Sequence, residues 1–257
     1  MNPAQTARRL ARAWLLGQHL QDLPEGCRPS TRVDGYAVQS QWPALLGKVG
    51  GWKIAATSVA GQNHIGVSGP LAGPVFASRV RVGDVTVSLT GNRMRVAECE
   101  VVFTFGRVVH PRVQAWTREE VMAQVATIRP GIEVPDSRFV HFERAGEAQL
   151  IADCACCRDM VLGTPVRPGA LLDALAGLKV QARVSDGRVL AGAGSAVLGD
   201  PVEALRWFVN EMSRAGQRIE AGQFLTTGAC VTPIPVQPGL TVQADFGELG
   251  RMQVRFV

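Results

Sequence analysis

The segment 96–105, VAECEVVFTF, alternates its side chains as a half-buried β-strand does, because successive residues of a strand point to opposite faces. One face would be wholly apolar and belongs in a core: Ala97, Cys99, Val101, Phe103 and Phe105. The other face would carry two carboxylates, Glu98 and Glu100, followed by Val102 and Thr104. The simplest interpretation is an amphipathic strand with one wet face.

The pattern elsewhere predicts helices first and strands afterwards. Apolar residues at helical spacing, such as Leu10 and Trp14, predict helices over about 4–20 and 34–46. From residue 51 onward, short β-branched runs alternate with Gly and Pro, which is typical of strands and turns. We therefore expect a helical N-terminal part, 1–50, on a mixed β core, 51–257, that is, an α+β fold.

Two helices and a hairpin are expected inside this core. The segment 117–128 opens with a capping box, Thr117 and Glu120, in which each side chain satisfies a free backbone N–H of the first turn. The segment 200–216 has Asp200 as N-cap and a glycine at its end, with apolar residues every three or four positions. The tail 238–257 predicts two strands around a Gly-rich turn.

Composition excludes several classes of protein. Hydrophobic residues make up 46% and charged residues 19%, which argues against global disorder. The net charge of +5 is scattered, without a basic stripe, so we expect no nucleic-acid partner. No apolar run approaches the ~20 residues of a membrane helix, so we expect no membrane partner. The Arg-rich start could be a transit peptide, but we favour a first helix and a cytoplasmic protein with six reduced cysteines.

A third carboxylate changes the interpretation of the first two. In RPGIEVPDSRF, Glu133 stands between Ile132 and Val134 and would face away from both. Paired strands lie about 4.8 Å apart, so pairing of this segment with 96–105 would bring three carboxylates together. Such a group repels itself unless a cation lies within it, and all-oxygen ligands suit Mg²⁺ or Mn²⁺. The pairing itself is a hypothesis.

Lysine is rare in this chain. Only Lys48, Lys53 and Lys179 are lysines among 27 basic residues. Arginine does not release its proton in proteins, whereas a partly buried lysine can. Lys53, in the predicted strand GWKIAATS, is thus a candidate acid or base, or a donor to an anionic substrate; the alternative is a surface lysine without a role.

Several segments together resemble a known family: GWKIAATS, AECEVVFTF, IEVPDSRF, IADCACCRDMVLG and the stretch from TTGACV to the C-terminus. In this order they are similar to the 2-keto-4-pentenoate hydratase branch of the fumarylacetoacetate hydrolase superfamily, from about residue 35 onward. The resemblance implies a mixed β-sandwich roll, with helices before it, and an active site at its mouth. It also implies a homo-oligomer.

The resemblance also implies site residues. Glu98, Glu100 and Glu133 would hold Mg²⁺ or Mn²⁺, and Lys53 would contact a small anionic 2-oxo acid. Asp136 and Arg138 match the DSR that follows the third ligand, where we expect substrate-binding or support roles. We expect substrate donors from Thr227 and Gly228 as well.

This chain departs from the family where hydratases carry an acidic residue. Positions 64–83 hold no Asp or Glu, and His64 is the nearest substitute as a catalytic proton carrier. Relatives often read ADNAS where this chain has ADCAC, so Cys154 and Cys156 replace polar residues. The expected reaction is a hydration, in which a 2-hydroxy-2,4-dienoate is ketonised and water then adds at C4 to give a 4-hydroxy-2-oxo acid.

Three alternatives stay open. The same scaffold could serve a 2-oxo acid decarboxylase, a C–C hydrolase or a tautomerase. The chain could also be a non-catalytic 2-oxo acid-binding protein that lacks part of the proton machinery. Finally, the cysteines of residues 154–157 could form a zinc or redox site.

Overall fold

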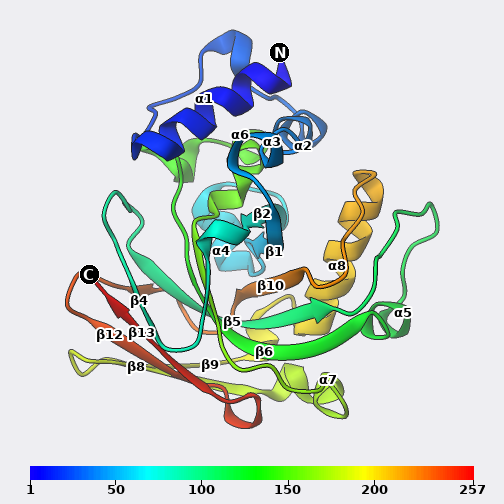
Figure 1. The fold of residues 1–257 in the computed structure, drawn as a ribbon, viewed down its shortest axis with the longest axis vertical. Coiled ribbons are helices and arrows are strands. Elements are labelled where there is room, and N and C mark those ends of the chain that lie inside the picture. The colour runs from blue at the N-terminus through cyan, green and yellow to red at the C-terminus, as the bar shows by residue number, and fades with distance from the viewer.

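Two β-sheets carry the fold in the computed structural model, which describes residues 1–257 (Figure 1). Across the larger, curled sheet the strands are β2 (Leu71–Phe76), β1 (Val49–Ala55), β10 (Phe224–Ala229), β5 (Val96–Phe105), β6 (Val125–Val134), β7 (Asp159–Leu162) and β3 (Val80–Val82), with β11 (Ile234–Pro235) beside β5. Across the smaller sheet they are β4 (Val85–Val87), β13 (Arg251–Phe256), β12 (Thr241–Asp245), β8 (Lys179–Val184) and β9 (Val189–Ala193). Parallel and antiparallel pairs both occur, so the predicted α+β fold with a mixed sheet is confirmed.

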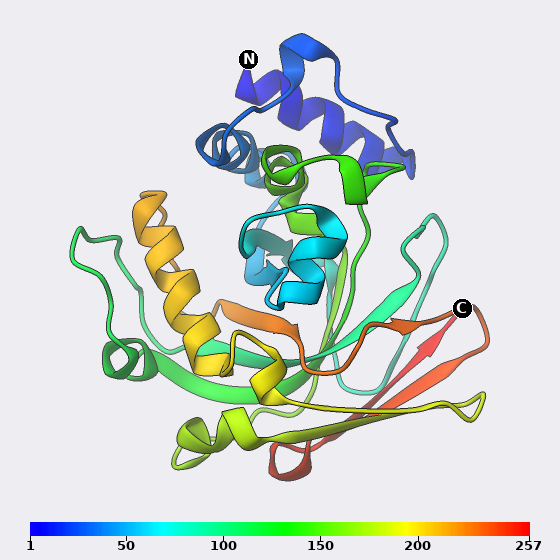
Figure 2. The ribbon, with the colours of Figure 1, turned by 180° about the vertical axis from the view of Figure 1, so that it is seen from behind.

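Eight α-helices accompany the sheets: α1 (Pro3–Leu16), α2 (Arg32–Gln39), α3 (Pro43–Leu46), α4 (Val59–Ile65), α5 (Arg118–Met122), α6 (Glu147–Ala152), α7 (Leu171–Ala174) and α8 (Pro201–Arg214). The first three gather at one end of the molecule, as Figure 2 shows from behind. None of the helices combines the length and the apolar character that crossing a bilayer requires.

The two faces of the curled sheet pack against different partners. One face joins the smaller sheet and α8 in a core of 42 buried residues, where Phe208 of α8 lies against Trp52 and Phe105. The other face joins the N-terminal helices in a second cluster of 17 buried residues, which includes Leu10 and Trp42. The carboxylate face of β5 is this second face, so helices rather than water cover much of it.

Most predicted elements are present, with shifted ends. The first helix ends at Leu16 because Gly17 adopts a left-handed conformation there, and the predicted helix 34–46 is two helices, the second of which starts at Pro43. The helix capped by Asp200 and both strands of the tail are confirmed. Helix α4 was not predicted. The division of the chain at residue 50 stays a prediction.

The predicted helix over 117–128 is wrong in its second half. The capping box of Thr117 and Glu120 forms, but the helix ends at Met122 and β6 begins at Val125. Residues 125–134 pair with β5 along its length, and this pairing outweighs the local helical pattern because strand preference depends strongly on neighbouring strands.

Candidate metal centre

Three carboxylates meet where β5 and β6 pair. The strands are antiparallel, Glu98 lies opposite Glu133, and Glu100 lies opposite Gly131. One oxygen from each carboxylate lies within 4.8 Å of the other two, and no other group of three His, Cys, Asp or Glu side chains converges in this way. The predicted pairing and convergence are therefore confirmed. The cysteines of 154–157 are buried thiols without such a ligand set.

Burial makes this arrangement costly without a cation. Glu100 and Glu133 are at most 1% exposed, and three of their four carboxylate oxygens lack any hydrogen-bond donor. Buried charges normally pair or bind metals. The donor set is all oxygen, which suits a hard divalent ion such as Mg²⁺ or Mn²⁺. The residues present thus fit the metal that the sequence predicts.

The ionisation of the three carboxylates is strongly perturbed. Burial raises the pKa of Glu98 and raises that of Glu100 well above its usual value. Burial also raises the pKa of Glu133 to about 7, although the charge on Lys53 partly offsets the rise. Protons and a metal ion would therefore compete for the same oxygens near neutral pH.

Lys53 lies beside the carboxylates on β1. Its Nζ forms an ion pair with Oε1 of Glu133 at 3.0 Å and donates to the carbonyl oxygen of Ala155 at 2.8 Å. Burial alone would lower the pKa of Lys53, but attraction by Glu133 and then by Glu98 outweighs it, so the pKa is raised. Next to ionised carboxylates, the lysine is a charged donor rather than a free base.

Strand β10 closes the third side of the centre. The hydroxyl of Thr226 donates to Oε2 of Glu100, and the backbone N–H of Gly228 donates to the same oxygen at 2.6 Å. Thr227 points to the opposite face and donates to the carbonyl of Val101 at 3.0 Å. Thr226 was not predicted from the sequence: strand alternation puts Thr226 and Thr227 on opposite faces, but the register of β10 against β5 decides which of them meets Glu100.

The carbonyl that contacts Lys53 comes from an unusual turn. Cys154, Ala155 and Cys156 all have positive φ, between 52° and 61°, which non-glycine residues rarely adopt. The turn also comes so close to β2 that a side chain at Gly73 would overlap the carbonyl of Cys154. No sequence pattern that we used predicts this conformation.

Asp136 and Arg138 are held by contacts within the protein. Asp136 accepts from the backbone N–H of Arg93 at 2.9 Å and pairs with Arg158 at 2.9 Å, which fastens the segment before β5 to the end of β6. Arg138 pairs with Asp153 and lies 4.4 Å from the ring centre of Trp14. These contacts favour the support roles over direct contact with substrate.

His64 lies apart from these interactions. It is exposed near the end of α4, and its ring centre is 5.8 Å from that of Phe142. No hydrogen bond or ion pair connects it to the carboxylates or to Lys53, so its catalytic role stays a prediction.

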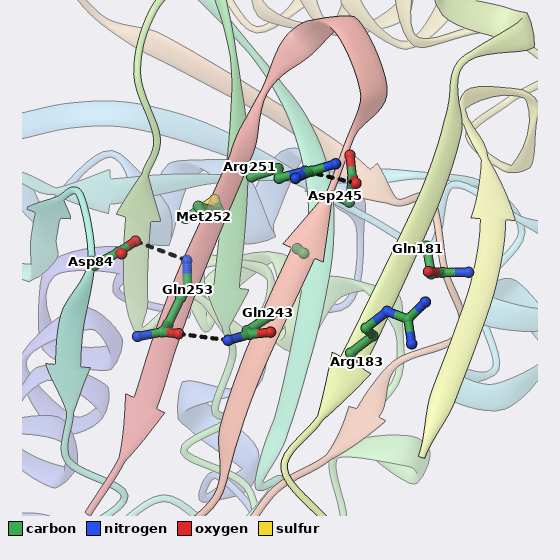
Figure 3. Close-up of a pocket in the computed structure, with 9 residues that line it drawn as sticks. Asp84, Gln181, Arg183, Gln243, Asp245, Arg251, Met252 and Gln253 are labelled. Carbon is green, nitrogen blue, oxygen red and sulfur yellow. Dashed lines mark hydrogen bonds and ion pairs between the residues drawn. The ribbon is translucent and has the colours of Figure 1, made fainter. Parts of the chain in front are cut away.

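A hollow of about 480 Å³ lies elsewhere, on the smaller sheet (Figure 3). Most of its polar side chains are paired with one another, as in the ion pair of Asp245 with Arg251 at 2.8 Å and the hydrogen bond of Gln243 to Gln253 at 2.9 Å. It contains no buried polar atom without a partner, in contrast to the carboxylate centre.

Comparison with known proteins places the chain in a family. Residues 67–257 match the family described as fumarylacetoacetate (FAA) hydrolase C-terminal. A 2-keto-4-pentenoate hydratase of Paraburkholderia xenovorans (strain LB400) is 32% identical over 229 residues, which are 87% of this chain and 83% of that protein. A 4-oxalocrotonate decarboxylase of Pseudomonas sp. (strain CF600) is 30% identical over 88% of this chain and 86% of that protein.

A solved structure resembles the whole chain. The 4-oxalocrotonate decarboxylase from Pseudomonas putida G7, complexed with magnesium and adipate, superposes with a TM-score of 0.88 and 25% identity over 99% of this chain and 97% of that one. The predicted resemblance and fold are confirmed by these matches. The chain belongs to the fumarylacetoacetate hydrolase family.

Proposed function

We propose that this chain is a metal-dependent hydratase that adds water to a 2-hydroxy-2,4-dienoate of the 2-keto-4-pentenoate type, giving a 4-hydroxy-2-oxo acid. The observation that carries the proposal is the convergence of half-buried Glu98 with buried Glu100 and Glu133, whose oxygens largely lack hydrogen-bond donors and lie beside a charged Lys53. Relatives named as hydratases at about 30% identity support the choice of reaction.

Glu98, Glu100 and Glu133 would hold Mg²⁺ or Mn²⁺, which would supply Lewis acidity to the carboxylate and keto oxygens of a 2-oxo acid. The protein positions these ligands before substrate arrives. Thr226 and Gly228 fix one oxygen of Glu100, and Lys53 lies against Glu133. Ionised, three carboxylates and one ammonium leave two negative charges, which one divalent cation balances.

Lys53 would serve as the donor to the anionic substrate. Its ammonium pairs with Glu133 at 3.0 Å and donates to the carbonyl of Ala155, which leaves a proton for a substrate oxygen. Because its pKa is raised, Lys53 stabilises negative charge more readily than it removes a proton. Proton transfer to C5 and C3, and from the water that attacks C4, would then need another group, for which His64 is the predicted candidate.

Decarboxylation of a 2-oxo acid is the second candidate. It is supported by the decarboxylase at 30% identity and by the decarboxylase structure with a TM-score of 0.88. Both reactions would use the same carboxylates and Lys53, so the products distinguish them. A decarboxylase releases CO₂ from an oxalocrotonate-type diacid, whereas a hydratase consumes the dienoate and forms a hydroxy acid.

The test compares wild type with Glu98→Gln on 2-hydroxypenta-2,4-dienoate, with Mg²⁺ and with EDTA. We expect EDTA to abolish hydration and the substitution to lower kcat/KM by about a hundredfold or more, because a ligand charge is lost. Hydration activity that is unchanged by EDTA and by the Glu98→Gln substitution would contradict the proposal. CO₂ release from the diacid without hydration would favour the decarboxylase. Turnover of neither substrate, with a 2-oxo acid still raising Tm, would indicate a binding protein.

A further inference from the structure

One half-buried arginine lacks the partner that all comparable arginines have. Nine arginines are buried or half-buried: Arg32, Arg79, Arg81, Arg112, Arg118, Arg129, Arg138, Arg158 and Arg188. Eight of them form an ion pair with Asp or Glu. Arg129 forms none, and its Nε is shut off from water without any acceptor. A charge in this position normally has a counter-charge.

Two threonines surround this arginine on the same face of the curled sheet. Arg129 lies on β6 opposite Val102 of β5, and the next pair on the same face of the sheet is Thr104 with Thr127. The hydroxyl of Thr127 lies 3.5 Å from Nη2 of Arg129. The hydroxyl oxygen of Thr104 is buried and has no hydrogen-bond partner. A guanidinium and two threonines thus share one face of the sheet, and no carboxylate forms an ion pair with this guanidinium.

The surroundings do nothing to stabilise the charge. Burial lowers the pKa of Arg129, and no neighbouring anion offsets this effect. A planar guanidinium binds the oxygens of carboxylate, phosphate or sulfate in a bidentate manner, and hydroxyl groups donate to the remaining oxygens. We propose that Arg129, Thr104 and Thr127 bind a small oxyanion at a second site on the curled sheet.

This site is separate from the carboxylate centre. Arg129 precedes Glu133 by four residues on β6, which corresponds to roughly 13 Å along a strand. Gly131 lies between them on the same face, and the space beside it is filled by the side chains of Met160 and Val102. The oxyanion is therefore not the substrate of the carboxylate centre, and the proposal does not depend on the reaction catalysed there.

The experiment titrates sodium sulfate into wild type, Arg129→Met and Thr104→Val, with NaCl at matched ionic strength as the salt control. Arg107→Met is the matched variant, since Arg107 is exposed and has no ion pair. We expect a saturable rise in Tm for wild type and Arg107→Met, with and without Mg²⁺. Apparent affinity should fall at least about tenfold in Arg129→Met, because a charged donor is lost, and less in Thr104→Val.

The difference in stability between Arg129→Met and wild type gives a second readout, because its sign should change when sulfate is added. Without sulfate, Arg129→Met should be as stable as wild type or more stable, because an unpaired charge is removed; in saturating sulfate it should be less stable. Selenate soaked into crystals should show an anomalous peak at Arg129. The proposal fails if the rise in Tm is not saturable or is equal in Arg129→Met. It also fails if sedimentation shows that Arg129→Met loses self-association, since a carboxylate of a second copy would then be the partner of Arg129.

Discussion

Two adjacent threonines on β10 make different contacts, and comparing them tests how Glu100 is held. Thr226 donates to Glu100, whereas Thr227 donates to the carbonyl of Val101 on the opposite face. Groups that orient a metal ligand typically change metal affinity by 10–100-fold. We expect Thr226→Val to weaken Mn²⁺ binding by about tenfold or more, as measured by calorimetry.

Thr227→Val is the matched control for this substitution. It removes the same hydroxyl group one residue away, so it should cost about 1 kcal/mol of stability and leave Mn²⁺ affinity unchanged. Equal effects of the two substitutions on Mn²⁺ affinity would contradict the assignment of Thr226 as the residue that orients Glu100.

The raised pKa of Glu133 makes the effect of metal depend on pH. A carboxyl group whose pKa rises from 4.5 to about 7 on folding stabilises the fold below its unfolded pKa, and this contribution is lost as the pH rises through 7. Mg²⁺ binds the ionised form, so its stabilising effect should grow over the same window. We expect saturating Mg²⁺ to raise Tm more at pH 8 than at pH 5.5. Thermal unfolding with Mg²⁺ or with EDTA at the two pH values measures the rise in Tm. An equal rise at both pH values would contradict the prediction.

At the residue scale, the sequence predicts the three carboxylates better than their surroundings. Strand alternation places Glu98 and Glu100 on one face of their strand. The apolar residues on either side of Glu133 likewise predict that its side chain points away from the core. The partners of Lys53 and Glu100 could not be predicted in this way. The carbonyl of Ala155 is a backbone atom whose position depends on the turn, and choosing Thr226 over Thr227 requires the register of β10 against β5.

At the scale of elements, the left-handed turn of Cys154–Cys156 should control Lys53. A methyl group on Gly73 would overlap the carbonyl of Cys154 and push the turn, with the carbonyl of Ala155, away from the lysine. We expect Gly73→Ala to destabilise the fold by about 1–3 kcal/mol and to lower kcat. Thermal unfolding and steady-state kinetics measure the two effects.

Gly194→Ala provides the control for this turn. Its added methyl group would overlap the carbonyl of Leu175, a similar clash with backbone, but outside the carboxylate centre. It should lower Tm without a comparable loss of kcat in the protein that remains folded. If both substitutions lower Tm and spare kcat, the turn has no role in positioning Lys53.

Elements whose pattern is local were predicted well, and those that depend on pairing were not. The helix from Pro201 has its own N-cap and apolar spacing, and it forms as expected. Residues 125–128 follow a capped helical turn, yet they extend because β5 offers them a partner. Because this partner strand is distant in the sequence, the pattern of neighbouring residues does not predict the pairing.

At the scale of the whole molecule, the N-terminal helices and the curled sheet share one cluster. Leu10 of α1 belongs to the same group of buried residues as Val102 and Phe224 of the sheet. Arg138 strengthens the connection, since it stacks on Trp14 and donates to the carbonyl of Cys157 at 2.7 Å. The helices should therefore unfold together with the carboxylate centre rather than as a separate unit.

Hydrogen exchange with and without Mg²⁺ tests this coupling and, with it, the predicted division at residue 50. A ligand that binds only the folded state slows every exchange event that requires the same cooperative unfolding. We expect Mg²⁺ to slow exchange of the buried Leu10 amide by the same factor as that of Val101 in β5, whereas the amide of exposed Val113 should not respond. If Mg²⁺ protects Val101 and leaves Leu10 unchanged, the helices open on their own, and the boundary near residue 50 separates two units of folding. If both are protected equally, the helical part and the β core form one catalytic unit, because stabilising the carboxylates at one end of the sheet then stabilises the helices that cover it.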